Sequence, residues 1–251
     1  MQRGANVENK TLQKEENVVD AAKMNLMIEG SIWKRILLFS IPLILGNLLQ
    51  QMYNTADSII VGQYVGSNAL AAVSASSALS NMLISFAQGT SVGAGVIIAQ
   101  YLGARDRRGV HDSVHTALAI SGILGVALTA LGIGLSRTLL GWMSTPAEVM
   151  DDAVLYFRIY FGGLIFNVLY NMTAGILNAV GNSRRSLLYI AIASGTNIVL
   201  DLVLICGLNM GVAGAAIATD MSQLVSAILA TLFLMRTDGS YRVRLADIRI
   251  N

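Results

Sequence analysis

Apolar residues occupy most of the chain in six long stretches, and short polar segments separate these stretches. The stretches lie near 33–62, 69–101, 111–136, 152–179, 186–206 and 211–236. A helix needs about 20 mostly apolar residues to cross the ~30 Å hydrocarbon layer of a bilayer, and each stretch meets this requirement. The pattern therefore predicts an all-α, polytopic membrane protein with six transmembrane helices. The lipid bilayer is one of its expected partners.

The first 30 residues are polar and mixed in charge, and they contain no apolar run long enough for the core of a signal peptide. We interpret residues 1–30 as a loose, disordered cytoplasmic tail. Residues 31–237 are then the six-helix transmembrane domain, and residues 238–251 are a cytoplasmic basic segment. The first helix would serve as an uncleaved insertion signal.

Composition supports the membrane interpretation. Of the 251 residues, 54% are hydrophobic and 13% are charged, whereas about 25% of the residues in an ordinary soluble domain are charged. The net charge of +2 does not suggest nucleic acid as a partner. The single cysteine, Cys206, lies in an apolar run and is interpreted as a small core residue.

The distribution of Lys and Arg predicts the orientation, because basic residues near helix ends are retained on the cytoplasmic side. Fifteen of them lie in the tail through Arg35, at 103–109, at 181–186 and from Arg236 onward. The segments 62–68, 137–151 and 207–211 hold one. We therefore expect both termini in the cytoplasm and the chain in the plasma membrane.

Polar side chains follow one face of several predicted helices. On the first helix, Gln50, Asn54 and Asp57 are spaced by four and three residues, which places them on one face. On the fifth helix, Asn197 precedes Asp201 by one turn. Such faces should meet one another or water, because an unsatisfied polar group in hydrocarbon costs several kcal/mol. For the Asn and Ser residues, interhelical hydrogen bonds remain an alternative to a functional role.

The carboxylates require a stronger reason. A charged Asp near the centre of a membrane helix costs about 2.5–3.5 kcal/mol, and Asp57, Asp201 and Asp220 all lie within apolar helices. Asp57 and Asp201 each lie roughly 8 Å from the outer ends of their helices, at 1.5 Å per residue, and so share a level. With Asn197 they offer the hard oxygen ligands that Na⁺ prefers, or a buried proton site.

Other motifs favour structural interpretations. Gly89 and Gly93 are four residues apart, which is typical of closely packed membrane helices. His111 and His115 are spaced as in a zinc-protease helix, but their place beside a basic loop favours a solvated pair at the membrane edge. Arg158 is either an interfacial anchor or an ion partner for one of the acids. Because no catalytic pair, metal cluster or phosphate loop remains, we expect neither catalysis nor a cofactor.

The segment 40–66, beginning Ser-Ile-Pro-Leu-Ile-Leu-Gly-Asn, resembles the first helix of the multidrug and toxic compound extrusion (MATE) family. Further similar strings are Ala-Gln-Tyr-Leu-Gly-Ala-Arg at 99–105, Asn-Ile-Val-Leu-Asp at 197–201 and Gly-Val-Ala-Gly-Ala-Ala-Ile-Ala-Thr at 211–219. No single string is diagnostic, but their order and spacing are specific, and they run along the whole six-helix span.

This resemblance implies a twelve-helix fold in two lobes that exports cationic or amphipathic small molecules against entry of Na⁺ or H⁺. By position, Asp57, Asn197, Asp201 and Thr219 match the cation site, and Asn171 matches a polar residue of the substrate cavity. We expect Gln50, Asn54 and Asp220 to line that cavity as well.

The sequence also departs from the family pattern. It holds one lobe, so transport would need a second six-helix lobe or a homodimer. Asp220 stands beside Thr219 where an apolar residue is expected, and Ser186 replaces an expected proline. A non-transporting fragment or assembly partner therefore remains an alternative. A flippase for lipid-linked saccharides is less favoured, because only Arg158 offers a basic group near the acids.

Overall fold

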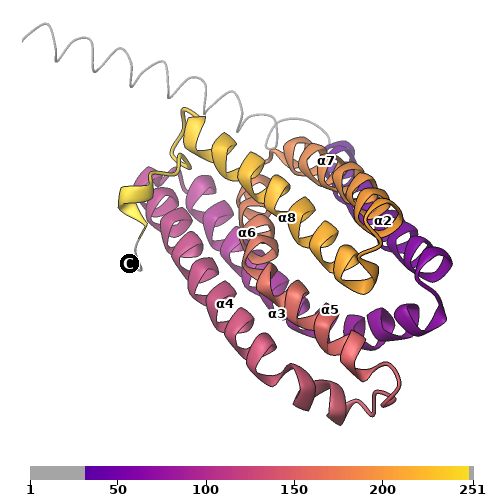
Figure 1. Ribbon diagram of the computed structural model, residues 1–251. Coiled ribbons are helices and arrows are strands. Elements are labelled where there is room, and N and C mark those ends of the chain that lie inside the picture. Colours follow the sequence, from indigo (N-terminus) through magenta and orange to yellow (C-terminus); the bar gives the residue numbers. More distant parts are fainter. Residues whose placement is uncertain (1–31, 249–251) are drawn as a thin grey trace, which may run out of the picture.

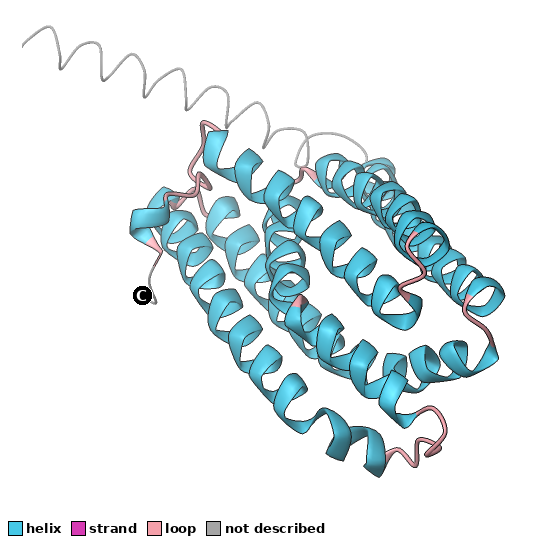
Figure 2. Ribbon diagram, in the orientation of Figure 1, coloured by secondary structure: helices cyan, strands magenta, loops and turns pink. Residues whose placement is uncertain are grey.

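The structure is a computed structural model that describes residues 32–248. These residues form helices and connecting turns without a strand (Figure 2). The elements are α2 (Ile32–Tyr64), α3 (Ser67–Gly103), α4 (Arg107–Trp142), α5 (Met150–Gly162), α6 (Leu164–Ala179), α7 (Ser183–Asp201), the π-helix η1 (Leu202–Gly207), α8 (Gly211–Arg236) and the 3₁₀ turn η2 (Leu245–Asp247). The predicted tail at 1–30 and residues 249–251 of the basic segment lie outside the described residues.

The helices confirm the predicted all-α membrane architecture. Five helices are long and apolar enough to span a bilayer, and α5 with α6 makes a sixth span if the bent pair counts as one. The apolar stretch at 152–179 predicted one span, and the structure divides this stretch into two helices that meet at a bend of 46°. The bend lies at Gly162 and Gly163, where two residues without side chains interrupt the helix.

The short helix α6 lies at the centre of the bundle. It packs against α3, α4 and α8, while α2 packs mainly against α7 (Figure 1). Phe157 and Phe161 of α5 and Leu164 of α6 are almost completely buried on either side of the bend. The bent span is therefore the packing core on which the longer helices are arranged.

The outer faces of the long helices are apolar and exposed, as a lipid environment requires. Only 11% of the most apolar part of α2 is buried inside the bundle, against 44% for α8. Trp33 at the beginning of α2 and Trp142 at the end of α4 are both 78% exposed. Tryptophan is enriched at the two interfaces of a membrane. The two tryptophans therefore indicate that α2 begins, and α4 ends, near a membrane interface.

The helices α3 and α6 approach each other closely at Gly175 on α6, and not at Gly89 and Gly93, where the glycine spacing predicted a close approach. A Cβ atom on Gly89 or Gly93 would meet nothing within 4 Å, so the packing role expected for this pair was wrong. A Cβ on Gly175 of α6 would instead lie 2.3 Å from Ser91 Oγ of α3. The Ser91 hydroxyl donates to the Asn171 carbonyl oxygen at 2.6 Å. One glycine and one serine thus bring the two backbones together.

Candidate functional site

Two carboxylates meet inside the bundle. Asp57 of α2 is 8% exposed, and Asp201, the last residue of α7, is fully buried. The two carboxyl groups lie within hydrogen-bonding reach of each other. Among the described residues, none of the ion pairs that we find involves either of them. Two adjacent carboxylates repel each other when both are ionised, so the pair favours a bound cation or a shared proton.

Four buried oxygen atoms around this carboxylate pair lack a hydrogen-bond donor. They are Asp57 Oδ1, Asn197 Oδ1, Asp201 Oδ1 and Asp201 Oδ2. Buried polar groups in native proteins are almost always satisfied, so an orphan cluster needs an explanation. Carboxylate and amide oxygens are the ligand types that hard cations take. The cluster therefore has the chemistry of a small cation site.

The neighbouring α8 helps to orient the amide of Asn197. The Nδ2 group of Asn197, which is completely buried, donates to the Thr219 hydroxyl at 3.5 Å. With the nitrogen directed toward α8, the Oδ1 atom has no donor. The backbone changes from an α-helix to the π-helix η1 directly after Asp201. Such π-helical segments are frequent at functional sites.

Aromatic and amide side chains surround the pair, and apart from Gln50, a predicted cavity residue, sequence reasoning assigned them no role in the site. Gln223 of α8 donates to the Tyr53 hydroxyl at 3.4 Å, and Gln50 hydrogen-bonds the same hydroxyl. Tyr156 and Tyr160 of α5 lie near Asp57, and their rings stack with centroids 5.9 Å apart. The spacing of three between Gln50 and Tyr53 was a usable signal, whereas no comparable spacing pointed to the tyrosines on α5.

Asp220 occupies a different place from the carboxylate pair. Its carboxyl group lies against Gly163, where a Cβ atom would be only 2.1 Å from Asp220 Cγ. It is also within hydrogen-bonding reach of the Gly163 backbone N–H. Gly163 precedes α6 and offers no side-chain cap. A carboxylate at the amino end of a helix is favoured by the unpaired N–H groups and the helix dipole.

The other predicted cavity residues are dispersed. Asn54 is exposed on α2. Asn171 donates to the side-chain oxygen of Asn167, one turn earlier on α6, at 2.8 Å. The larger of the two pockets that we describe holds about 460 Å³ and is lined mainly by α3 and α4, without any of the predicted cavity residues. The structure brings together Asp57, Asn197, Asp201 and Thr219, but not Asn54 or Asn171.

Arg158 is not an ion partner for the acids in this structure. Its Nε atom donates to the Ser136 hydroxyl of α4 at 2.9 Å, and the residue is exposed. The alternative that paired it with a buried carboxylate was wrong, because its guanidinium binds Ser136, which is completely buried on α4.

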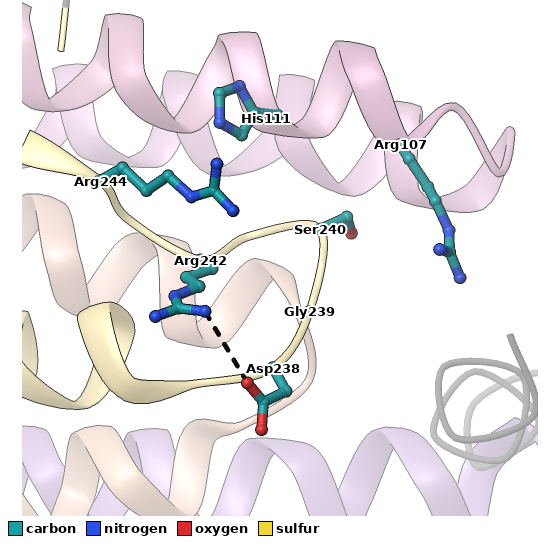
Figure 3. A pocket seen from close by; sticks show the side chains of 7 residues that line it. All are labelled: Arg107, His111, Asp238, Gly239, Ser240, Arg242 and Arg244. Atoms are coloured by element: carbon teal, nitrogen blue, oxygen red, sulfur yellow. Dashed lines mark ion pairs between the residues drawn. The ribbon is translucent and has the colours of Figure 1, made fainter. Parts of the chain in front are cut away.

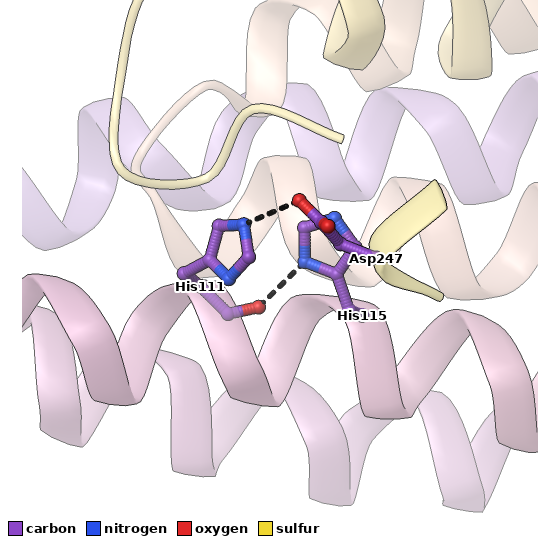
Figure 4. Close-up of side chains that lie close together, drawn as sticks. All are labelled: His111, His115 and Asp247. Atoms are coloured by element: carbon purple, nitrogen blue, oxygen red, sulfur yellow. Dashed lines mark hydrogen bonds and ion pairs between the residues drawn. The ribbon is translucent and has the colours of Figure 1, made fainter. Parts of the chain in front are cut away.

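The expected solvated pair of histidines was also wrong. His115 is completely buried beneath the segment that follows α8 (Figure 4). Its Nδ1 contacts the His111 carbonyl oxygen at 2.7 Å, and its Nε2 accepts from the Arg244 backbone N–H at 3.1 Å. His111, His115 and Asp247 lie close enough together to hold a metal ion. Both ring nitrogens of His115 are engaged, however, so a metal would have to displace one of these bonds.

Comparison with known proteins identifies the architecture. A family model described as MatE matches residues 42–203. The chain is 32% identical over 208 residues to the probable multidrug resistance protein YpnP of Bacillus subtilis (strain 168), a match that covers 83% of this chain and 47% of that protein. A second Bacillus subtilis relative, the probable multidrug resistance protein YoeA, is 31% identical over 210 residues, which is 82% of this chain and 45% of that protein.

Solved transporter structures share the fold. One described as the outward-facing conformation of a multidrug resistance MATE family transporter matches with a TM-score of 0.83 and 34% identity, over 90% of this chain and 50% of that one. The inward-facing conformation matches with a TM-score of 0.75 and 34% identity, over 80% and 46%. The chain spans about half the length of the relatives it matches. By its family model and its fold, the chain belongs to the MatE family of multi-pass membrane transporters.

Proposed function

We propose that this chain acts as one lobe of a cation-coupled exporter, in which Asp57, Asn197, Asp201 and Thr219 bind the coupling Na⁺ or H⁺. The observation that carries the proposal is the cluster of four buried oxygen atoms without donors around the carboxylate pair. One cation would satisfy these oxygens and remove the repulsion between the carboxylates. No catalytic step is part of this function.

The position of the pair suits coupling. Asp57 belongs to α2 and Asp201 to α7, so the two halves of the site lie on different helices. A site between helices changes its affinity when the helices move, and differential affinity between two states is what coupling requires. Loss of the cation would leave two carboxylates in repulsion and would favour a conformation that separates α2 from α7.

We propose that the exported compounds are cationic or amphipathic small molecules. Two named relatives are probable multidrug resistance proteins. None of the ion pairs that we find among the described residues places a basic side chain beside Asp57, Asp201 or Asp220. Gln50, Asn54, Asn171 and Asp220 remain the proposed cavity residues. Asn54 is exposed on α2, where a second lobe or a second copy of the chain would meet it.

The proposed setting is the plasma membrane, with both termini in the cytoplasm. The basic turns support this orientation, because Arg107 begins α4, Arg184 lies in the first turn of α7 and Arg236 ends α8, all at the same end of the bundle. We call this end the basic end. The opposite end carries the exposed ion pair of Arg137 with Asp151 at 3.2 Å.

The test is efflux of a fluorescent cationic dye from vesicles that contain the chain together with a second lobe. An imposed Na⁺ or H⁺ gradient should drive export, and Asp201→Asn should abolish gradient-driven export while leaving the amount of inserted protein unchanged. Unchanged export in this variant would contradict the assigned site. Absence of export by the unmodified chain in every pairing would instead favour an assembly role.

A further inference from the structure

The segment after α8 folds back over the basic end of the bundle. We call residues 237–248 the strap. The Val243 N–H donates to the Leu234 carbonyl oxygen at 3.0 Å, and the Arg244 N–H donates to His115 at 3.1 Å. These bonds fix the strap against the end of α8 and against α4.

Side chains alternate along the strap between the interior and the surface. Tyr241 is 7% exposed and Val243 is 2% exposed, and both pack in the core cluster that includes Leu234. Arg242 and Arg244, at the intervening positions, are exposed. Alternation is the property of an extended backbone, so burial of the two apolar residues forces the two arginines to the other side.

The arginines of the strap face the beginning of α4 across an open pocket of about 250 Å³ (Figure 3). Its lining residues are Arg107 and His111 of α4 with Asp238, Gly239, Ser240, Arg242 and Arg244 of the strap. Asp238 is the one carboxylate among them, and it pairs with Arg242 at 4.0 Å.

The carboxylates near the pocket leave the guanidinium of Arg244 without an ion pair among the described residues. Asp247 lies 3.5 Å from His111 Nε2. Asp112 lies 3.8 Å from Arg108 on the same helix. Within the described residues, the guanidinium of Arg244 takes part in none of the hydrogen bonds or ion pairs that we find, whereas its backbone N–H binds His115. The guanidinium groups of Arg242 and Arg244 therefore lie at a space whose lining holds one carboxylate.

We propose that this pocket binds the phosphate of an anionic phospholipid headgroup. Guanidinium groups match phosphate oxygens in charge and geometry. The amino end of α4, where Arg107 lies, adds the favourable field of the helix dipole. The pocket sits where membrane spans end, so the bilayer supplies its ligand at high local concentration. Basic pockets at this depth are typical lipid headgroup sites. A bound headgroup would hold the strap against α4.

The experiment uses the whole chain in nanodiscs that contain phosphatidylcholine with a small fraction of fluorescent phosphatidylglycerol, and it measures energy transfer from the chain's tryptophans to the lipid. Arg244→Gln removes the charge but keeps the backbone N–H that binds His115. Arg184→Gln removes an exposed charge at the same end of the bundle, outside the pocket. A binding curve is recorded for each variant, with and without inorganic phosphate.

We expect Arg244→Gln to weaken phosphatidylglycerol binding on the order of fivefold, since one basic side chain near a charged surface contributes about 1 kcal/mol. Arg184→Gln should leave the binding curve unchanged. Equal weakening by both variants would show a diffuse surface charge and overturn the proposal. Inorganic phosphate that binds with the same dependence on Arg244, without any preference for phosphatidylglycerol, would assign the pocket to soluble anions and also overturn it.

A second variant separates a loss of lipid binding from a loss of folding. Arg244→Lys retains the charge and should retain most of the binding, while circular dichroism and the thermal unfolding midpoint should match between Arg244→Gln and Arg244→Lys. Loss of binding in both variants at matched stability would contradict charge recognition as its cause.

Discussion

Asp57 and Asp201 place their carboxyl groups side by side although they lie far apart in the sequence, on α2 and α7, and neither carboxylate has a basic partner among the described residues. The contact lies between α2 and α7, a pair of helices that pack directly against each other. A cation held at this point would join the two helices, and its release would weaken the contact. The functional predictions below depend on this relationship.

The first prediction concerns the cation dependence of stability. In Asp57→Asn the new amide can donate to Asp201, and a hydrogen bond to a charged group contributes about 1.5–3 kcal/mol. The variant should be more stable than the unmodified chain in Na⁺-free buffer at neutral pH. The unmodified chain should gain about 2.7 kcal/mol at a Na⁺ concentration of 100 times its Kd, or gain stability on acidification if the ion is H⁺.

Chemical denaturation in mixed micelles measures both effects. Asp112→Asn, which removes a half-exposed carboxylate at the basic end, is the matched control and should retain the cation response. An equal cation response in Asp57→Asn and the unmodified chain would contradict the assigned role of the pair.

The bend between α5 and α6 should be sensitive to a single methyl group. Gly163→Ala would place a Cβ atom 2.1 Å from Asp220 Cγ, and relieving such overpacking typically costs about 1–3 kcal/mol. Gly162→Ala is the control, because its Cβ would meet nothing within 4 Å. Asp220→Ala should rescue the first variant in a double-mutant cycle. Equal stabilities of the two alanine variants would refute the close contact.

The approach of α3 to α6 makes a parallel prediction at Gly175. Gly175→Ala would bring a Cβ atom within 2.3 Å of Ser91 Oγ and 3.1 Å of its carbonyl oxygen. We expect a loss of about 1–3 kcal/mol in the free energy of unfolding. Gly93→Ala on α3 has open space and should leave the stability nearly unchanged. The opposite order would restore the packing role that the four-residue spacing suggested for Gly93.

Removal of the Arg158 side chain should have no effect on the coupling of export to the cation. Because its guanidinium binds Ser136 of α4 and neither of the buried acids, Arg158→Ala should leave the cation dependence of dye efflux intact. A hydrogen bond of this kind typically contributes about 0.5–1.5 kcal/mol to stability. A shift in the concentration of Na⁺ or H⁺ that gives half-maximal export would show that Arg158 senses the carboxylates after all.

The sequence predicted the carboxylate pair because burial of a charge is costly and because helical rise places both acids at one depth. That reasoning needs only residue type and position along a helix. It could not reveal the place of Asp220 against Gly163, since that contact depends on how α8 is rotated relative to α5 and α6. Periodicity alone also could not show the break at Gly163, as an apolar pattern continues through it.

The ends of the helices were harder to predict for a similar reason. His115 follows a basic loop, and such a position is normally solvated. The strap covers it only because Tyr241 and Val243 are buried beside α4 and α8, and this long-range packing leaves no local signal. The π-helix after Asp201 is likewise a backbone irregularity within a uniformly apolar run.

Infrared difference spectroscopy of the reconstituted chain tests the central claim most directly, because it detects the carbonyl band of a protonated, buried carboxyl group. At low Na⁺ and acidic pH, the carboxylate pair should contribute such a band. The band should disappear when the pH is raised, or when Na⁺ is added at constant pH if the coupling ion is Na⁺, and it should be missing in the double variant Asp57→Asn with Asp201→Asn. The claim that this pair holds an exchangeable cation would be contradicted if the unmodified chain and the double variant gave identical spectra in this region at every pH and Na⁺ concentration.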